Sequence, residues 1–124
     1  MMSESSKAMT RLLVVEDEYL IRMLLEDMLA DLGYEVVAAL GTIGEAREFA
    51  AKGEFSAAVL DVNVSGEWIF PVADILAERG LPFVFITGYG ERGLPEPYRN
   101  HPALQKPFQA EQLKSALDTL LANA

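Results

Sequence analysis

The sequence predicts an α/β protein whose core is a doubly wound parallel sheet with helices on both faces. Short apolar runs alternate with longer amphipathic segments over most of the chain, a pattern typical of parallel strands joined by right-handed crossovers. The runs at 11–15, 57–62 and 82–87 are almost wholly apolar, as central strands covered on both faces should be. With 124 residues, of which 51% are hydrophobic, the chain is long enough for one folded domain.

The individual elements follow from the apolar runs and from the residues that start and stop helices. Gly33, Gly53 and Gly80 are placed to end helices. Thr42 is placed to cap one, and Pro71 suits a first helical turn, where its missing N–H costs nothing. The predicted strands are 11–15, 35–40, 57–62, 82–87 and 102–105, and the predicted helices are 19–32, 43–52, 71–79 and 109–121.

The stretch 88–102 breaks the regular alternation. Glycine and proline are concentrated where a crossover helix would normally lie, and both residue types disfavour a long helix. We therefore predict a short or irregular fourth helix. The residues concerned are Gly88, Gly90, Gly93, Pro95, Pro97 and Pro102.

Composition narrows the classes of function. A net charge of −9 argues against a nucleic-acid surface and against a membrane surface of anionic lipid, so protein partners or a bound cation fit better. Cysteine is absent, which excludes disulfides and thiolate sites and suits a reducing cytosol. The chain lacks a signal-peptide core and an apolar stretch of membrane-spanning length. We expect a cytoplasmic protein with a disordered tail at 1–10 and one domain at 11–122.

Polar side chains follow four of the predicted strands, at the point where each strand ends. Glu16 and Asp17 follow the first strand, Asp61 the third, Thr87 the fourth and Lys106 the fifth. Parallel strands have their carboxyl ends at one edge of the sheet, and doubly wound sheets bind ligands there. The sequence therefore predicts one small cleft holding three acids, a hydroxyl and an ammonium.

Such a cleft suits phosphoryl transfer. A carboxylate can attack a phosphoryl group when a cation and an ammonium neutralise the charge that builds up on the phosphoryl oxygens. Three clustered acids repel one another and hold protons more tightly unless a cation is present. Mg²⁺ relieves that repulsion because it prefers oxygen ligands that include one or two carboxylates.

Each of these residues also has an ordinary structural explanation. Asp61 alone suits a turn, and acids such as Glu16 and Asp17 are favoured at the start of a helix by its dipole. Thr87 alone is an unremarkable strand end, and a lysine before proline, such as Lys106, is usually a solvated surface residue. The coincidence of all of them at neighbouring strand ends favours the functional interpretation.

The motifs resemble those of two-component response-regulator receiver domains, the CheY-like phosphoacceptor modules, from Arg11 to Leu121. The resemblance implies a flavodoxin-like sheet of five strands in the order 2-1-3-4-5. The run Phe85-Ile86-Thr87-Gly88 further resembles the Phe-Ala-Thr-Gly signature of a subgroup of single-domain receivers, with Ile86 in place of the alanine. The triplet Lys106-Pro107-Phe108 belongs to the same pattern.

The resemblance assigns the phosphoryl chemistry. It implies that Asp61 accepts the phosphoryl group, that Lys106 pairs with its oxygens, and that Thr87 donates a hydrogen bond to it. It also implies a cis peptide bond between Lys106 and Pro107, which an X-Pro bond permits at small cost.

The same resemblance implies a Mg²⁺ site. Its ligands would be Asp17, Asp61 and the backbone carbonyl of Asn63, with Glu16 binding directly or through water. Most receivers have aspartate where this chain has Glu16, and the extra methylene moves that carboxylate outward.

The implied function is signalling rather than turnover. A sensor histidine kinase or a phosphotransfer protein would supply the phosphoryl group, and a downstream protein would respond. Candidate contact surfaces are the first helix, with Leu20, Ile21, Leu24 and Leu25, and the segment 88–102 together with the fifth strand. A homodimer is compatible with the sequence, although no pattern favours it.

The switch departs from the common receiver pattern. Many receivers place an aromatic residue three positions before the lysine, and here that position is Ala103, which cannot transmit a signal by rotating. We therefore expect phosphorylation to act by ordering 88–102, with Tyr89 as the moving aromatic side chain. The loop after Asp61 has Ser65 where many receivers have proline.

Two other functions are compatible with the pattern. One is a Mg²⁺-dependent phosphohydrolase of the aspartyl-phosphate type, which usually needs a second aspartate where this chain has Asn63. The other is a receiver fold that serves only as an unphosphorylated interaction scaffold. No residues remain for an output domain after Leu121, which suggests a stand-alone receiver or part of a longer protein. His101 is expected to be exposed. Trp68 is expected to pack near the cleft mouth, with contact to a partner as the alternative.

Overall fold

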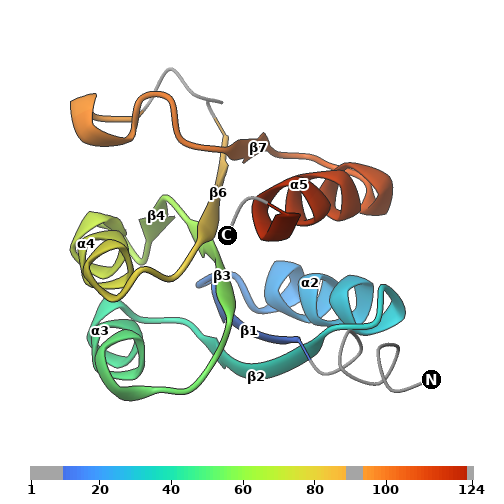
Figure 1. Ribbon diagram of the computed structural model, residues 1–124, viewed down its shortest axis with the longest axis horizontal. Coiled ribbons are helices and arrows are strands. Elements are labelled where there is room, and N and C mark those ends of the chain that lie inside the picture. Colours follow the sequence, from blue (N-terminus) through green and yellow to red (C-terminus); the bar gives the residue numbers. More distant parts are fainter. Residues whose placement is uncertain (1–9, 89–93, 123–124) are drawn as a thin grey trace.

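The computed structural model describes residues 10–88 and 94–122 and contains the predicted parallel sheet. Its strands run in the order β2-β1-β3-β6-β7, which is the predicted order when the strands of a small hairpin are left out of the numbering (Figure 1). The strands are β1 Arg11–Val15, β2 Glu35–Leu40, β3 Ala57–Asp61, β6 Phe83–Thr87 and β7 Ala103–Gln105.

Helices cover both faces of the sheet, as predicted. Helices α2 (Tyr19–Asp31) and α5 (Ala110–Ala122) lie on one face, on the right of Figure 1. Helices α3 (Ile43–Lys52) and α4 (Phe70–Arg79) lie on the other. The predicted helix boundaries agree with these to within one residue.

The central strands are buried because each of them supplies side chains to two hydrophobic cores. Along β6, Phe83 and Phe85 enter the core under α3 and α4, while Val84 and Ile86 enter the core under α2 and α5. β1 and β3 alternate in the same way, as the period of two along a strand requires. This arrangement explains why these strands lack the polar positions of a sheet with one solvated face.

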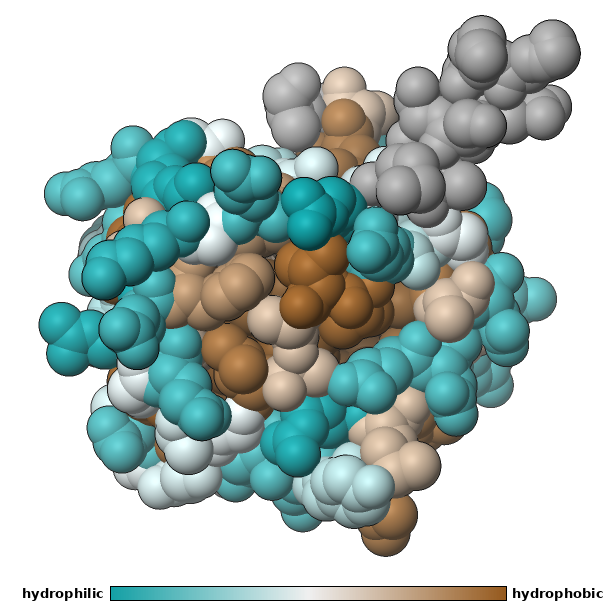
Figure 2. All heavy atoms as spheres, turned by 90° about the horizontal axis from the view of Figure 1, so that it is seen from below, coloured by the Kyte–Doolittle hydropathy of each residue, from teal (hydrophilic) through white to brown (hydrophobic). Residues whose placement is uncertain are grey.

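The strand β2 forms one edge of the sheet and is only partly buried from Val36 to Leu40. Seen from below, its side of the molecule shows apolar side chains framed by hydrophilic ones (Figure 2). The other edge strand, β7, is short and is also partly buried or exposed along its length.

The predicted helix signals act as expected. The Thr42 hydroxyl accepts a hydrogen bond from the Glu45 N–H at 3.2 Å, which caps α3. Pro71 stands in the first turn of α4, and that helix ends at Gly80, whose φ of 73° is left-handed. Local residues thus determine where α3 and α4 begin or end.

A two-stranded hairpin between β3 and α4 was not predicted. β4 (Asn63–Val64) pairs antiparallel with β5 (Glu67–Trp68) around the turn at 65–66. Strands of two residues are too short to show an alternating pattern, so the sequence indicated only the turn. The hairpin holds Trp68 stacked on Phe70 at 6.1 Å between ring centroids, with 57% of the residue exposed. Trp68 therefore packs on one neighbour without being buried.

The described part of the 88–102 stretch confirms a short, irregular fourth helix. Between residues 94 and 102, the one helical element is the 3-10 turn η2 (Glu96–Tyr98). Tyr98, the last residue of this turn, is buried and donates a hydrogen bond from its hydroxyl to Asp74 on α4 at 2.5 Å. Tyr89, the expected moving aromatic, lies outside the described residues.

His101 is not exposed, contrary to expectation. Its Nε2 lies 2.8 Å from the carbonyl oxygen of Phe83, and its ring stacks on the Phe83 ring at 4.2 Å between centroids. Burial lowers the pKa of His101, although the bond to Phe83 partly opposes this. The sequence could not reveal this contact because it joins the irregular segment to β6.

The predicted tail lies outside the described residues, apart from Thr10. Among the described helices, none has the length and apolar character needed to span a bilayer.

Helix α2 provides a test of the core assignment. Leu29→Ala should lower the free energy of unfolding by about 2–5 kcal/mol, because Leu29 is fully buried between α2 and the sheet. Leu20→Ala is the matched control: Leu20 is 77% exposed, and its change should stay within about 0.5 kcal/mol. Urea unfolding measures both. Equal losses for the two variants would contradict the described packing of α2.

Candidate functional site

The structure brings the predicted strand-end residues together at one edge of the sheet. Glu16 and Asp17 follow β1, Asp61 ends β3, Thr87 ends β6, and Lys106 follows β7. Glu16, Asp61 and Thr87 are buried, which is unusual for polar side chains and shows that the fold encloses them. The pairing of neighbouring parallel strands therefore brings these strand-end residues together.

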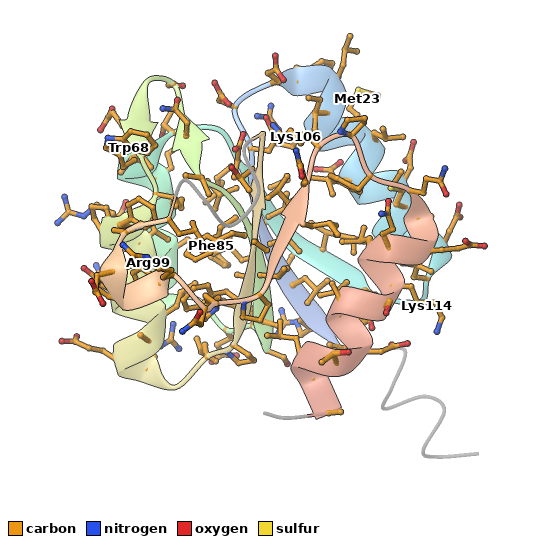
Figure 3. The ribbon with its side chains drawn as sticks, turned by 90° about the horizontal axis from the view of Figure 1, so that it is seen from above. Met23, Trp68, Phe85, Arg99, Lys106 and Lys114 are labelled. Atoms are coloured by element: carbon orange, nitrogen blue, oxygen red, sulfur yellow. The ribbon has the colours of Figure 1, made fainter. Side chains whose placement is uncertain are left out.

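Lys106 supplies the positive charge of this site. Its Nζ lies 3.1 Å from Oδ2 of Asp61 and 3.2 Å from Oε1 of Glu16. In Figure 3, Lys106 lies between Trp68 of the hairpin and Met23 of α2. Both contacts are ion pairs in a largely buried place, where water screens charges less than at the surface.

The backbone directs the lysine toward the acids. The Lys106 N–H donates to the carbonyl oxygen of Thr87 at 2.9 Å, which continues the pairing of β6 with β7 past the end of the strands. The Lys106–Pro107 peptide bond is cis, as the family resemblance implied.

The three acids are close enough to share one cation. Glu16, Asp17 and Asp61 each offer a carboxylate oxygen, and these oxygens lie within 4.8 Å of one another. Within the described residues, Glu16 Oε1 is the buried side-chain atom that makes no hydrogen bond of regular geometry. A set of hard oxygen donors with one incompletely satisfied buried oxygen fits Mg²⁺ chemically.

Burial makes Glu16 hard to ionise. Burial and the neighbouring Asp61 together raise the pKa of Glu16 to about 7, although the N–H of Glu18, which donates to Oε2 at 3.0 Å, and the Lys106 ammonium oppose the rise. Burial also lowers the pKa of Lys106, but the charges of Asp61 and Glu16 outweigh that effect and raise it. The ammonium is therefore charged at neutral pH, while Glu16 exchanges its proton near neutrality.

The hairpin places Asn63 beside the phosphoacceptor candidate. The Asn63 N–H lies 3.4 Å from Oδ1 of Asp61, and the Asn63 side-chain oxygen accepts from the Gly66 N–H at 3.1 Å. The neighbouring Val62 carbonyl accepts from Ile69 at 2.9 Å. Because antiparallel ladders alternate, the Asn63 carbonyl points away from β5 and is not used by that ladder.

Two residues at the site were missed by sequence reasoning. Arg22 on α2 donates from its guanidinium to the carbonyl oxygen of Glu16 at 2.8 Å, which stabilises the turn after β1. Ser65 donates its backbone N–H to Oδ2 of Asp17 at 3.0 Å. The only local signal was Gly66, which marks a tight turn, and nothing in the sequence joins either residue to its acidic partner.

The proposed docking face of α2 is only partly exposed. Leu20 is 77% and Leu24 52% exposed, whereas Leu25 is 1% exposed and belongs to the core. Ile21 is partly buried against the same core. The inclusion of Leu25 in a contact surface is therefore wrong, and the exposed apolar set on this helix is Tyr19, Leu20, Met23 and Leu24.

Comparisons with known proteins agree with this geometry. The family model described as the response regulator receiver domain matches residues 12–118. The chain is 36% identical over 112 residues to the transcriptional regulatory protein PdtaR of Mycobacterium tuberculosis, covering 87% of this chain and 55% of that protein. It is 32% identical over 117 residues to the phyllosphere-induced regulator PhyR of Methylorubrum extorquens, covering 90% of this chain and 43% of that protein.

Solved structures share the whole fold. The solution structure of SdrG from Sphingomonas melonis Fr1 superposes with a TM-score of 0.81 at 43% identity, covering 92% of this chain and 98% of that chain. The chain spans about half the length of the curated relatives it matches. Membership of the Phe-Ala-Thr-Gly subgroup stays a prediction. By its motifs, its fold and the match over residues 12–118, the chain belongs to the response regulator receiver domain family.

Proposed function

We propose that Asp61 accepts a phosphoryl group from a sensor histidine kinase or a phosphotransfer protein in a Mg²⁺-dependent step. The observation that carries this proposal is the ion pair of 3.1 Å between Lys106 and Asp61 inside a cluster of three acids. A lysine held against a buried aspartate at strand ends supplies both the nucleophile and the charge that phosphoryl transfer needs. In this proposal the protein acts in signalling and does not turn over a substrate.

Each residue has a defined part in the transfer. An oxygen of Asp61 forms a bond to phosphorus while the bond from phosphorus to the donor breaks, and the donor leaves with that electron pair. Lys106, already 3.1 Å from Asp61, then pairs with the phosphoryl oxygens. Thr87, at the end of the adjacent strand β6, donates a hydrogen bond from its hydroxyl to the attached phosphoryl group.

The metal ligands in this proposal are Asp17, Asp61 and the carbonyl of Asn63, with Glu16 bound directly or through water. When bound, Mg²⁺ neutralises charge on the phosphoryl oxygens. The short reach between the three carboxylates, within 4.8 Å, supports this assignment. Arg22 and Glu18 hold the turn that carries Glu16 through hydrogen bonds of 2.8 and 3.0 Å.

The two competing functions lack such support. A phosphohydrolase of the aspartyl-phosphate type needs a general acid two residues after the nucleophile, and the Asn63 amide cannot supply a proton. The Asn63 side chain is instead bonded to the hairpin backbone. A scaffold that is never phosphorylated would have no need for a buried ion pair, because replacing such a pair with apolar residues is often neutral or stabilising.

Treatment with a small phosphodonor tests the phosphoacceptor directly. With Mg²⁺ present, the intact mass should increase by one phosphoryl group, and Asp61→Asn should abolish the increase because an amide is a poor nucleophile. Asp118→Asn is the matched control, since Asp118 is an exposed acid paired with Lys114 on α5. Rapid release of phosphate from esters would favour the hydrolase, and an unchanged mass would favour the scaffold.

Mg²⁺ affinity should depend on pH through Glu16. Because the pKa of Glu16 is raised to about 7, the carboxyl is protonated below that pH and must lose its proton to help bind the cation. Affinity should therefore rise about tenfold per pH unit up to about pH 7 and then level off. Fluorescence of Trp68, the single tryptophan, reports binding because Trp68 pairs with Asn63.

The control for this prediction is Glu16→Gln, which keeps the shape of the side chain and cannot titrate. Its Mg²⁺ affinity should be nearly constant over the same pH range. An affinity of the unaltered protein that does not change between about pH 5 and pH 7 would contradict the assigned role of Glu16.

We further propose that phosphorylation changes partner binding through 88–102. Ala103 cannot act as the usual aromatic switch. Two contacts fix the described part of the segment: the hydrogen bond from Tyr98 to Asp74 and the contact between Nε2 of His101 and the Phe83 carbonyl oxygen. These contacts join the segment to α4 and to β6, the strand that ends in Thr87. A movement of Thr87 toward an attached phosphoryl group would therefore alter the contacts between β6 and this segment.

Amide hydrogen exchange tests this switch. Addition of beryllium fluoride with Mg²⁺, a mimic of the phosphoryl group, should slow exchange over 88–101 because the segment becomes ordered. The helix α3 serves as the internal control, since it lies away from that segment and should exchange equally in both states. Identical exchange over 88–101 with and without the mimic would contradict the proposed switch.

A further inference from the structure

The turn between β4 and β5 has an unusual backbone. Its two residues, Ser65 and Gly66, have φ values of 55° and 82°, both in the left-handed region. Two-residue hairpin turns of this kind favour asparagine, aspartate or glycine at the first position, because other side chains are strained there. A serine at that position therefore needs contacts outside the turn to hold it.

Ser65 makes two such contacts, each with a different loop. Its backbone N–H donates to Oδ2 of Asp17 at 3.0 Å, and its hydroxyl donates to the carbonyl oxygen of Gly41 at 3.3 Å. Asp17 follows β1, and Gly41 follows β2. The hairpin is thereby tied to the turns at the ends of two neighbouring strands.

The turn after β2 is itself closely packed against the acidic turn. A Cβ added at Gly41 would lie 2.7 Å from the Arg22 guanidinium, and the same nitrogen donates to the carbonyl oxygen of Glu16 at 2.8 Å. Glu16, Arg22, Gly41, Ser65 and Asp17 therefore form a continuous chain of contacts around the acidic cluster.

Within the described part of the chain, the bond from Ser65 is the one hydrogen bond that reaches the Asp17 side chain. A carboxylate has about four lone-pair positions on two oxygens, so one N–H leaves acceptor capacity for a cation. Hydrogen bonds that orient a metal ligand typically account for about 10- to 100-fold in metal affinity. The contact thus orients Asp17 without occupying it fully.

We propose that Ser65 is a positioning residue for the cation: its left-handed turn aims the backbone N–H at Asp17 and holds that carboxylate facing Glu16 and Asp61. This inference rests on the proposed Mg²⁺ site and assigns part of its affinity to the hairpin. The hydroxyl of Ser65 anchors the turn to Gly41, while the N–H acts on the ligand.

Calorimetric titration with MgCl₂ tests the proposal. Many receivers carry proline at this position, but the turn of this chain has a φ of 55° at Ser65, which proline cannot adopt. Ser65→Pro also removes the N–H, so it should weaken Mg²⁺ binding about tenfold or more. Ser65→Gly keeps the N–H and suits the turn, so its loss should stay within about threefold. If both variants weaken binding equally, the N–H has no special role and the proposal is wrong.

A double-mutant cycle shows whether Ser65 acts through Asp17. In an Asp17→Ala background, Ser65→Pro should change Mg²⁺ affinity by less than about twofold, because the carboxylate that it positions is gone. A loss as large as in the unaltered background would mean that the proline disturbs the site by another route, and it would overturn the proposal.

Amide exchange of Ser65 provides a readout that needs neither metal nor proline. The exposed Ser65 N–H should exchange slowly in the unaltered protein and at least about tenfold faster in Asp17→Ala, because its acceptor is removed. Equal exchange rates would overturn the proposal. A protein that binds Mg²⁺ but takes no phosphoryl group would contradict the proposed function alone, whereas a protein that binds no Mg²⁺ would contradict both.

Discussion

The charge balance around Lys106 is the interaction on which the strand-end site depends. One ammonium faces Glu16 and Asp61 at 3.2 and 3.1 Å, and Asp17 adds a third carboxylate to the same small volume. Burial strengthens both the attraction and the repulsion, since little water is present to screen them. Burial, with the charge of Asp61, raises the pKa of Glu16. The single ammonium cannot balance all three acids, which suits the site to a divalent cation.

The sheet allows these charged side chains to lie close together without entering the hydrophobic core. Its central strands bury apolar side chains on both faces, and the polar residues appear only where each strand leaves the core. The backbone of each strand is paired up to that point, so the charged side chains project from rigid elements. A site on strand ends can therefore combine burial with precise placement, which phosphoryl transfer requires.

Contacts of the hairpin reach the irregular segment as well as the acids. Trp68 of the hairpin stacks on Phe70, which in turn stacks on Tyr98 at 5.7 Å between ring centroids. The Tyr98 hydroxyl donates a hydrogen bond to Asp74, and Nε2 of His101 lies at hydrogen-bond distance from the carbonyl oxygen of Phe83. The loop after the phosphoacceptor and the segment that replaces the fourth helix thus share one group of aromatic side chains, although they are far apart in sequence.

The sequence by itself determined the alternation of strands and helices and the set of strand-end residues, because apolar periodicity and capping residues such as Thr42 act locally. The order of the sheet was implied by the resemblance to receiver domains. Only the tertiary structure decided which side of α2 is buried, so that Leu25 enters the core and Leu20 does not. It likewise decided the pairing of β4 with β5, the stacking of His101 on Phe83 and the bond from Ser65 to Asp17. These contacts join residues that are distant in sequence or elements that are too short to show a pattern, so they exist only once the chain has folded.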